Sequence, residues 1–139
     1  MSTIPGLVFG VDLGATKILG GAFAPGAKLL GSERRPAQGS EGASRVIDNA
    51  LLVLETLRER HGAPVAIGIG AAGQIEWPTG RVLSAAGTIP GWAGTELGRA
   101  VATQFDCPIV VDNDANVAAL AEQRLGAGAG ARCVVCVTL

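Results

Sequence analysis

Apolar residues in this chain fall into short runs that are separated by glycines, prolines and polar residues. Near the N-terminus, three such runs are broken at Gly14 and at Pro25-Gly26. This pattern predicts three strands, at about residues 6–12, 17–23 and 27–35, each antiparallel to its neighbour in the chain. The first part of the chain is therefore expected to form a β-meander.

A long helix is predicted after the meander, from Glu41 to Arg60. Apolar residues recur there at helical spacing, and the face that they form consists of Val46, Ile47, Ala50, Leu51, Leu54 and Leu57. Ser40 is placed to cap the first turn and Gly62 to end the last one. His61, the single histidine of the chain, is interpreted as a surface residue favoured by the helix dipole.

The second half of the chain alternates between strands and helices. Short apolar strands are predicted at 64–70 and 108–111, and helices at about 94–105 and directly after residues 112–116. The last helix has an apolar face formed by Val117, Leu120, Ala121 and Leu125. A final strand is expected from Arg132 to Leu139.

Residues 68–73, Gly68-Ile-Gly-Ala-Ala-Gly73, match the dinucleotide-binding fingerprint letter for letter. That fingerprint requires an amphipathic helix directly after the glycines. Residues 74–83 instead form two short segments around a Pro78-Thr79-Gly80 turn, which predicts a hairpin. We therefore expect no nicotinamide or flavin binding at this motif.

Composition narrows the function classes. With 139 residues, 48% hydrophobic and 17% charged, the chain is long enough for one globular domain with a core. A net charge of −1 gives no electrostatic basis for binding nucleic acid or an anionic membrane. The N-terminus lacks the features of a secretion signal, and no apolar run reaches membrane-spanning length. We expect a cytoplasmic protein with no nucleic-acid partner and no membrane partner.

Three cysteines, Cys107, Cys133 and Cys136, have no histidine near them in the sequence. The last two have the spacing of redox and zinc motifs. In the predicted final strand, however, residues three apart point to opposite faces, so both sulfurs cannot reach one ion. Reduced cysteines in the core are the expectation.

The first candidate site is the turn at residues 10–17, Gly10-Val-Asp-Leu-Gly-Ala-Thr-Lys17. A tight turn between strands exposes consecutive backbone N–H groups, which form a concavity that binds anions, and Gly14 supplies backbone freedom. Asp12 is placed to hold a hard cation, and Thr16 and Lys17 to donate to phosphate oxygens. The alternative is a plain hairpin that carries an exposed Asp and an exposed Lys.

The second candidate site is the polar run Asp112-Asn-Asp114, where a parallel strand gives way to a helix. Ligands of open α/β sheets bind outside the carboxyl ends of strands, which is this location. A carboxylate here can orient or deprotonate a hydroxyl nucleophile, and Asn113 can hold the same hydroxyl groups. The alternative, helix capping, accounts for one polar residue but does not require three in a row plus Asn116.

The two candidate sites together have the layout of a phosphotransferase. Phosphoryl transfer requires cradled donor phosphates, a bridging metal and an acceptor hydroxyl aimed in line. The residues placed to serve the donor and the metal are Asp12, Gly14, Thr16 and Lys17. The residues placed to meet the acceptor are Asn113 and Asp114.

The sequence resembles the ROK family of sugar kinases and repressors, in the actin-like ATPase superfamily. The matching segments, in the family's order, are Val11-Asp-Leu-Gly-Ala-Thr-Lys-Ile18, Gly68-Ile-Gly-Ala-Ala-Gly73, Ile89-Pro-Gly-Trp92 and Val111-Asp-Asn-Asp-Ala-Asn-Val-Ala-Ala-Leu-Ala-Glu122. The resemblance implies that Asp114 is the catalytic base that activates the sugar hydroxyl. It also implies that Asn113 and the Gly73 backbone belong to the sugar pocket, and that residues 12–17 are the first phosphate motif.

Two positions depart from the family pattern. Ala15 stands where the phosphate turn usually has a second glycine, and a methyl group is tolerable there if φ stays negative. Thr88 stands where many family glucokinases have Asn. Thr88 is therefore a candidate substrate-binding residue, and the sugar preference stays open.

The resemblance implies an RNase H-like α/β fold, a mixed sheet with three antiparallel and then parallel strands and helices on both faces. It implies a homo-oligomeric enzyme that phosphorylates a hexose or N-acetylhexosamine with ATP and with Mg²⁺ at Asp12. Residues 1–130 are expected to form its N-terminal domain, and residues 131–139 the first strand of a C-terminal domain. The second phosphate motif, the zinc site and the adenine pocket are expected only in that further domain.

Two alternatives stay open beside the kinase. One is a sugar-sensing regulator of the same family without its DNA-binding segment, and the other is a non-enzymatic actin-like ATPase domain. By itself the 139-residue chain is expected to bind ATP weakly and to turn over negligibly, because it supplies one wall of a two-domain cleft. Its final strand is expected to pair with another chain, or else the segment after Gly126 is expected to be disordered.

Overall fold

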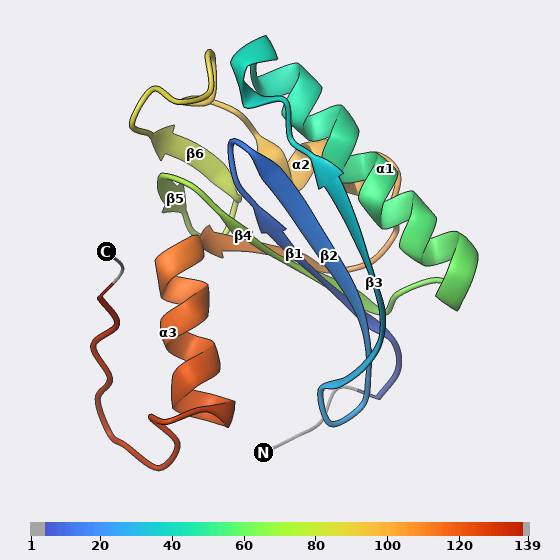
Figure 1. The fold of residues 1–139 in the computed structure, drawn as a ribbon, viewed down its shortest axis with the longest axis vertical. Coiled ribbons are helices and arrows are strands. Elements are labelled where there is room, and N and C mark those ends of the chain that lie inside the picture. Colours follow the sequence, from blue (N-terminus) through green and yellow to red (C-terminus); the bar gives the residue numbers. More distant parts are fainter. Residues whose placement is uncertain (1–4, 138–139) are drawn as a thin grey trace.

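Five strands form the central sheet of the computed structural model, which describes residues 5–137 (Figure 1). Their order is β3-β2-β1-β4-β7, and their bounds are Val8–Leu13 (β1), Lys17–Ala24 (β2), Lys28–Pro36 (β3), Ala66–Ala71 (β4) and Ile109–Asn113 (β7). β1, β2 and β3 are antiparallel, whereas β4 is parallel to both β1 and β7. The mixed sheet expected from the sequence, with its N-terminal meander, is confirmed.

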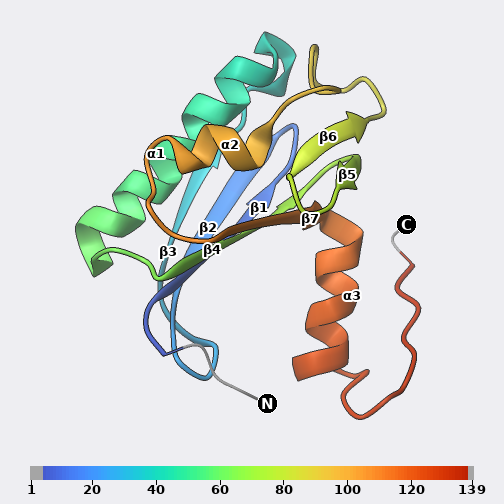
Figure 2. The same cartoon turned by 180° about the vertical axis from the view of Figure 1, so that it is seen from behind.

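One face of the sheet is covered by α1 (Ala43–His61) and α2 (Leu97–Ala102), which lie in front of the strands in Figure 2. Gly20 of β2 lies so close to α1 that a Cβ there would collide with Val53 and Leu57. Alternate residues of each strand point to this face. Those of β1 are buried in the core: Phe9, Val11 and Leu13.

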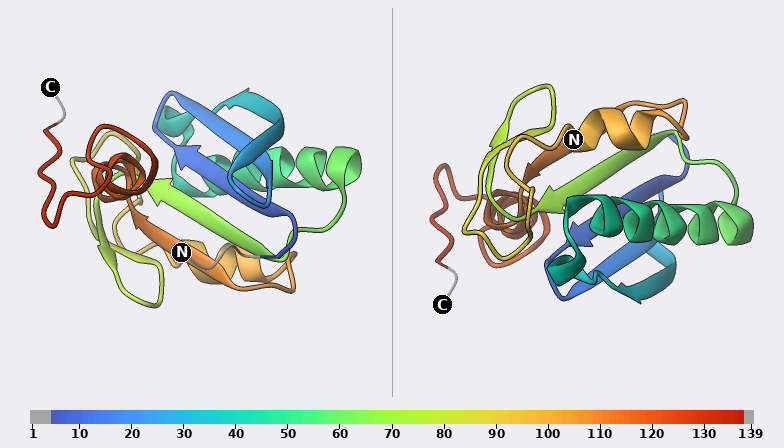
Figure 3. Two further views of the ribbon diagram at one scale, coloured as in Figure 1. Left: turned by 90° about the horizontal axis from the view of Figure 1, so that it is seen from below. Right: turned by 90° about the horizontal axis from the view of Figure 1, so that it is seen from above.

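The opposite face carries α3 (Asp114–Leu125), which packs at the β4–β7 side (Figure 3). The rest of that face is an open, largely apolar groove of about 1160 Å³, lined among others by Val8, Phe23, Leu29 and Val110. The apolar face that the sequence indicates on α3 is not buried: Val117, Leu120 and Leu125 are 39%, 52% and 66% exposed and line this groove.

The start of α1 also differs from the sequence expectation. Ser40 does not cap the helix but lies in a 3-10 turn, η1 (Gly39–Glu41). The chain then changes direction at Gly42, whose φ of 99° is readily adopted by glycine, and α1 begins. The end is as predicted, since the Gly62 N–H donates to the Arg58 carbonyl at 2.9 Å. Among the described residues, no helix combines the length and the apolar character needed to span a membrane.

α2 is shorter than the helix expected over residues 94–105. Its expected first turn pairs with a strand instead, because the Gly94 N–H donates to the Val82 carbonyl at 2.7 Å. The Val82 N–H in turn donates to the Thr95 carbonyl at 2.8 Å. Backbone groups bonded to a strand in this way cannot also close a helical turn.

The hairpin predicted after Gly73 is present. Its strands are β5 (Gln74–Glu76) and β6 (Arg81–Ser84), which pair antiparallel. No helix follows Gly73 directly in the described chain. The fingerprint at residues 68–73 therefore lacks the helix that a dinucleotide site requires, as expected.

Residues 131–137 run beside α3 without forming a strand (Figures 1 and 2). Val135 is 83% exposed, and Cys133 and Cys136 are exposed as well. The strand and the buried cysteines expected here are therefore wrong for the described part, and residues 138–139 lie outside it. The reason is that this segment has no neighbouring strand with which to pair. Its assignment to a further domain stays a prediction.

Cys107 behaves differently from the other two cysteines. It lies partly buried just before β7. Burial raises the pKa of its thiol, and the neighbouring Asp106 carboxylate adds to the rise. Both effects favour the protonated thiol, so Cys107 is a poor nucleophile and a poor metal ligand.

Candidate functional site

Two carboxylates lie in one row across the carboxyl ends of the parallel strands. Asp12 of β1 is in register with Gly70 of β4, and Gly70 is in register with Asp112 of β7. Residues in register project to the same face, here the face that carries α3. α3 begins directly above Gly70: a Cβ at this position would lie 3.5 Å from the Asp114 Cα, an ordinary van der Waals contact.

Asp12 and Asp114 line one cavity of about 410 Å³. The other lining residues are small or apolar: Val11, Gly70, Ala115, Val117, Ala118 and Ala121. Both carboxylates are exposed. Asp114 accepts a hydrogen bond from the Ala115 N–H at 2.8 Å through Oδ1, and its Oδ2 has no partner in the described chain. The structure thus brings the predicted base and the predicted cation ligand to one cavity.

Asn113 caps α3 and also holds the loop that follows β4. Its Oδ1 accepts from the N–H groups of Ala115 at 3.0 Å and Asn116 at 3.3 Å. Its Nδ2 donates to the Gly73 carbonyl at 2.7 Å. The capping interpretation is therefore confirmed, and the two residues expected in the sugar pocket are in contact. Because Oδ1 already accepts twice, the second N–H of Nδ2 is the group left to meet a ligand.

Asp112 has a role that the sequence reasoning did not give it. Its Oδ1 accepts from the Asn113 N–H at 2.7 Å and from Asn116 Nδ2 at 3.0 Å. These bonds fix the corner between β7 and α3, from which Asn113 and Asp114 project. The available signal was the spacing of Asp112 and Asn116, since residues four apart face each other across one helical turn.

The turn between β1 and β2 is closed by the Gly14 N–H, which donates to the Lys17 carbonyl at 3.1 Å. Neither Gly14 nor Ala15 has a positive φ, so alanine is accommodated, while the backbone freedom predicted for Gly14 is not used. Within residues 5–137, the N–H groups of Ala15 and Thr16 donate to no protein acceptor. The side chains of Thr16 and Lys17 are exposed and unpaired there. The turn therefore offers several free donors, as an anion site requires.

The carboxylates do not form a complete metal site by themselves. In the described residues, no group of three or more His, Cys, Asp or Glu side chains comes together. Mg²⁺ commonly uses one or two protein carboxylates and takes its other ligands from phosphates and water. Asp12, an exposed carboxylate that lines the cavity, fits a partial ligand set of that kind, although residues 14–17 do not themselves line this cavity.

Trp92 anchors the long loop between β6 and α2. Its side chain is 2% exposed, and its Nε1 donates to the Ala72 carbonyl at 2.9 Å, next to Gly73. Thr88 lies exposed on the same loop. No hydrogen bond within the described chain joins Thr88 to Asn113 or to the Gly73 loop, so its place in the sugar pocket stays a prediction.

Replacing Trp92 by Phe is expected to lower the free energy of unfolding by about 1–3 kcal/mol, because the Ala72 carbonyl loses its donor. Urea unfolding followed by far-ultraviolet circular dichroism measures this loss. Trp77→Phe is the matched control, since Trp77 is 68% exposed and an exposed substitution changes stability by about 0.5 kcal/mol or less. Equal losses in both variants would contradict the anchoring role of Trp92.

Comparison with known sequences supports the motifs described above. Residues 8–139 match the ROK family. The chain is 36% identical over 134 residues to a glucokinase of Streptomyces coelicolor, and this match covers 96% of the chain and 41% of that enzyme. The chain therefore spans less than half the length of this curated relative.

Solved structures show the same fold. A ROK family glucokinase from Streptomyces griseus, in complex with glucose and AMPPNP, matches with a TM-score of 0.80 and 34% identity, over 90% of this chain and 38% of that one. A ROK family transcriptional regulator, a homologue of the E. coli MLC protein, matches with a TM-score of 0.74 and 18% identity, over 86% and 30%. At that identity the second match shows the fold alone.

Proposed function

This chain belongs to the ROK family, and we propose that its full-length protein phosphorylates a sugar hydroxyl with ATP. The proposed acceptor is a hexose or an N-acetylhexosamine. The likeness to glucokinases at 36% and 34% identity supports this class of reaction. Since the chain spans 41% of the length of the Streptomyces coelicolor glucokinase, we propose that it supplies one side of the site.

On the acceptor side, Asp114 is the proposed general base. Asp114 lines the cavity, and its Oδ2, which has no hydrogen-bond partner in the described chain, takes the proton of the sugar hydroxyl as that oxygen attacks. The free N–H of Asn113 Nδ2 donates to a sugar oxygen and so orients the acceptor. The bond from Asn113 to the Gly73 carbonyl, at 2.7 Å, keeps this amide in one orientation.

On the donor side, the β1–β2 turn is the proposed phosphate cradle. The N–H groups of Ala15 and Thr16, together with the side chains of Thr16 and Lys17, donate to phosphate oxygens. When bound, ATP would supply the transferred phosphoryl group, and Asp12 would hold a Mg²⁺ ion that neutralises phosphate charge.

One observation carries the proposal: Asp12 and Asp114 line the same cavity of about 410 Å³. Phosphoryl transfer requires that the donor phosphates and the acceptor base reach one point from two sides. A free carboxylate could bind sugar in a regulator as well, so the preference comes from the comparisons. The likeness to glucokinases at 36% and 34% identity favours the kinase over the regulator, which the chain matches at 18%.

A coupled assay of the full-length protein tests the proposal. ADP release is measured with Mg²⁺ and ATP across glucose, fructose, mannose, N-acetylglucosamine and N-acetylmannosamine. We expect release that depends on at least one of these sugars and a phosphorylated sugar among the products. ADP release that is the same without sugar would favour the non-enzymatic ATPase alternative. Sugar binding by calorimetry with no phosphorylated product would favour the regulator.

A further inference from the structure

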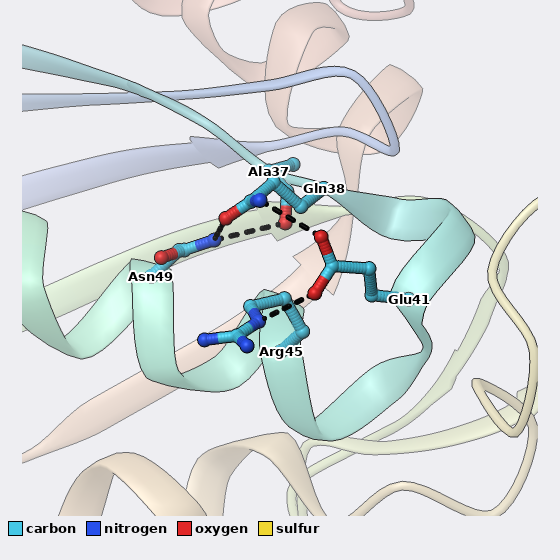
Figure 4. Close-up of polar contacts among 5 residues, drawn as sticks. All are labelled: Ala37, Gln38, Glu41, Arg45 and Asn49. Carbon is cyan, nitrogen blue, oxygen red and sulfur yellow. Dashed lines mark hydrogen bonds and ion pairs between the residues drawn. The ribbon is translucent and has the colours of Figure 1, made fainter.

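Asn49 is a buried polar side chain on α1, only 8% exposed. Its Nδ2 donates to the Ala37 carbonyl at 3.2 Å and to the Gln38 Oε1 at 3.1 Å, as Figure 4 shows. A polar group is placed in a core at a free-energy cost unless its hydrogen bonds are made. Asn49 therefore attaches the segment that follows β3 to the middle of α1.

This segment, residues 37–41, is held in an unusual conformation. Gln38 has a φ of 56°, in the left-handed region that residues other than glycine seldom adopt. Its Nε2 donates to Glu41 Oε1 at 2.8 Å, and Arg45 Nε donates to Glu41 Oε2 at 2.9 Å (Figure 4). A backbone in this region persists where surrounding contacts hold it. Here Asn49 and Arg45 of α1 supply contacts, and Glu41 of η1 joins Arg45 to Gln38.

The same segment holds the phosphate cradle. The Ala37 N–H donates to the Thr16 carbonyl at 2.9 Å, and the Gly39 N–H donates to the Ala15 carbonyl at 3.0 Å. The approach at Gly39 is close, since a Cβ there would lie 2.5 Å from the Ala15 oxygen. Ala15 and Thr16, the two central residues of the β1–β2 turn, are thus hydrogen-bonded to residues 37–39. Residues 37 and 38 are in turn hydrogen-bonded to Asn49.

The direction of these bonds sets the direction of the cradle donors. In a planar trans peptide, the carbonyl and the following N–H point in opposite directions. Fixing the Ala15 carbonyl on Gly39 therefore turns the Thr16 N–H away from residues 37–39. The bond from the Ala37 N–H to the Thr16 carbonyl holds the residue whose backbone N–H and hydroxyl group are both proposed donors.

We propose that Asn49 is a positioning residue for the phosphate donor, acting through residues 37–39 on the β1–β2 turn. The proposal rests on the function proposed above and adds a residue that touches neither sugar nor nucleotide. Its effect is preorganisation: donors already aimed at the phosphates need no ordering when the nucleotide binds. Loss of Asn49 weakens binding of the donor and leaves the sugar side, built from Gly73, Asn113 and Asp114, unchanged.

Steady-state kinetics of Asn49→Ala in the full-length protein test the proposal. We expect the KM for ATP to rise about tenfold, the size of effect that follows from losing one buried donor. The KM for the sugar should stay as in the unmodified protein. Val53→Ala is the matched control, because Val53 lies on α1, is fully buried, and faces Gly20 of β2 instead of residues 37–41.

Gly39→Ala is the second variant, and it keeps the proposal testable if Asn49→Ala does not fold. Its added methyl group pushes directly on the Ala15 carbonyl, so the KM for ATP should rise again. Equal rises in the KM for ATP and for the sugar, or the same rise in Val53→Ala, would show general destabilisation and overturn the proposal.

Amide hydrogen exchange separates this proposal from the proposed function. In Asn49→Ala we expect the amides of Ala37 and Gly39 to exchange faster, because their acceptors on the turn are no longer held in place. Unchanged exchange would overturn the positioning role. If the unmodified protein phosphorylates no sugar, the proposed function fails, and the exchange result decides the positioning role on its own.

Discussion

Asp114→Asn lowers the turnover of the full-length protein by about 10²–10⁴-fold, the range expected for loss of a general base. The affinity for sugar stays largely intact. The reason lies in the local geometry, since Asp114 is exposed in the cavity and uses only Oδ1 within the described protein. Asparagine keeps the size of the side chain and an acceptor for the Ala115 N–H, but it cannot take a proton from a hydroxyl group.

Turnover and sugar affinity are measured separately, by the coupled assay and by titration calorimetry. Asp48→Asn is the matched control, because Asp48 is an exposed carboxylate on α1 without an ion pair or a side-chain hydrogen bond in the described chain. We expect its turnover to be unchanged. Unchanged turnover in Asp114→Asn would rule this residue out as the base, whereas lost sugar affinity would make it a binding residue.

Asp12→Asn is expected to lower kcat/KM for ATP by about 10–10²-fold, the effect of removing a charged partner from a cation and its phosphates. The KM for sugar should change little, because no hydrogen bond within residues 5–137 joins Asp12 to Asn113 or the Gly73 loop. The Asp12 carboxylate accepts no hydrogen bond within the described protein, so its replacement by an amide removes no side-chain hydrogen bond or ion pair there. The fold should therefore be as stable as before, which thermal unfolding checks.

The Mg²⁺ dependence of the rate is the decisive measurement for Asp12. If this carboxylate holds the cation, the variant should need a higher Mg²⁺ concentration for half-maximal rate. The control is again Asp48→Asn, which should follow the curve of the unmodified protein. A variant with the same Mg²⁺ dependence and the same KM for ATP would contradict a donor-side role for Asp12.

Local features of the chain were predictable from sequence because their causes are local. The breaks at Gly14 and Pro25-Gly26 separate three strands that the structure confirms. The Pro78-Thr79-Gly80 turn predicted the β5–β6 hairpin and so removed the dinucleotide interpretation. The Asp112–Asp114 run was correctly placed at a strand–helix junction, since an apolar strand and a helical face flank it.

Other features were decided by contacts between segments that are distant in the sequence. α3 has an apolar face in the sequence, but nothing in the described chain covers it, because the pattern of one helix does not say which segment packs against it. Residues 94–96 were predicted to be helical, but their backbone groups form hydrogen bonds with β6 instead. Residues 131–137 have the composition of a strand and no partner strand, because hydrogen-bonded pairing is a property of two segments and not of one.

The candidate site divides in the same way. The sequence by itself determined that the polar side chains proposed to carry chemistry lie at the ends of strands. Only the tertiary structure decided that Asp12 and Asp114 share a cavity, because the parallel register of β1, β4 and β7 aligns their carboxyl ends. It also decided that Asn49 is linked to the β1–β2 turn, since that link runs through backbone groups of residues 37–39, whose partners no residue pattern records.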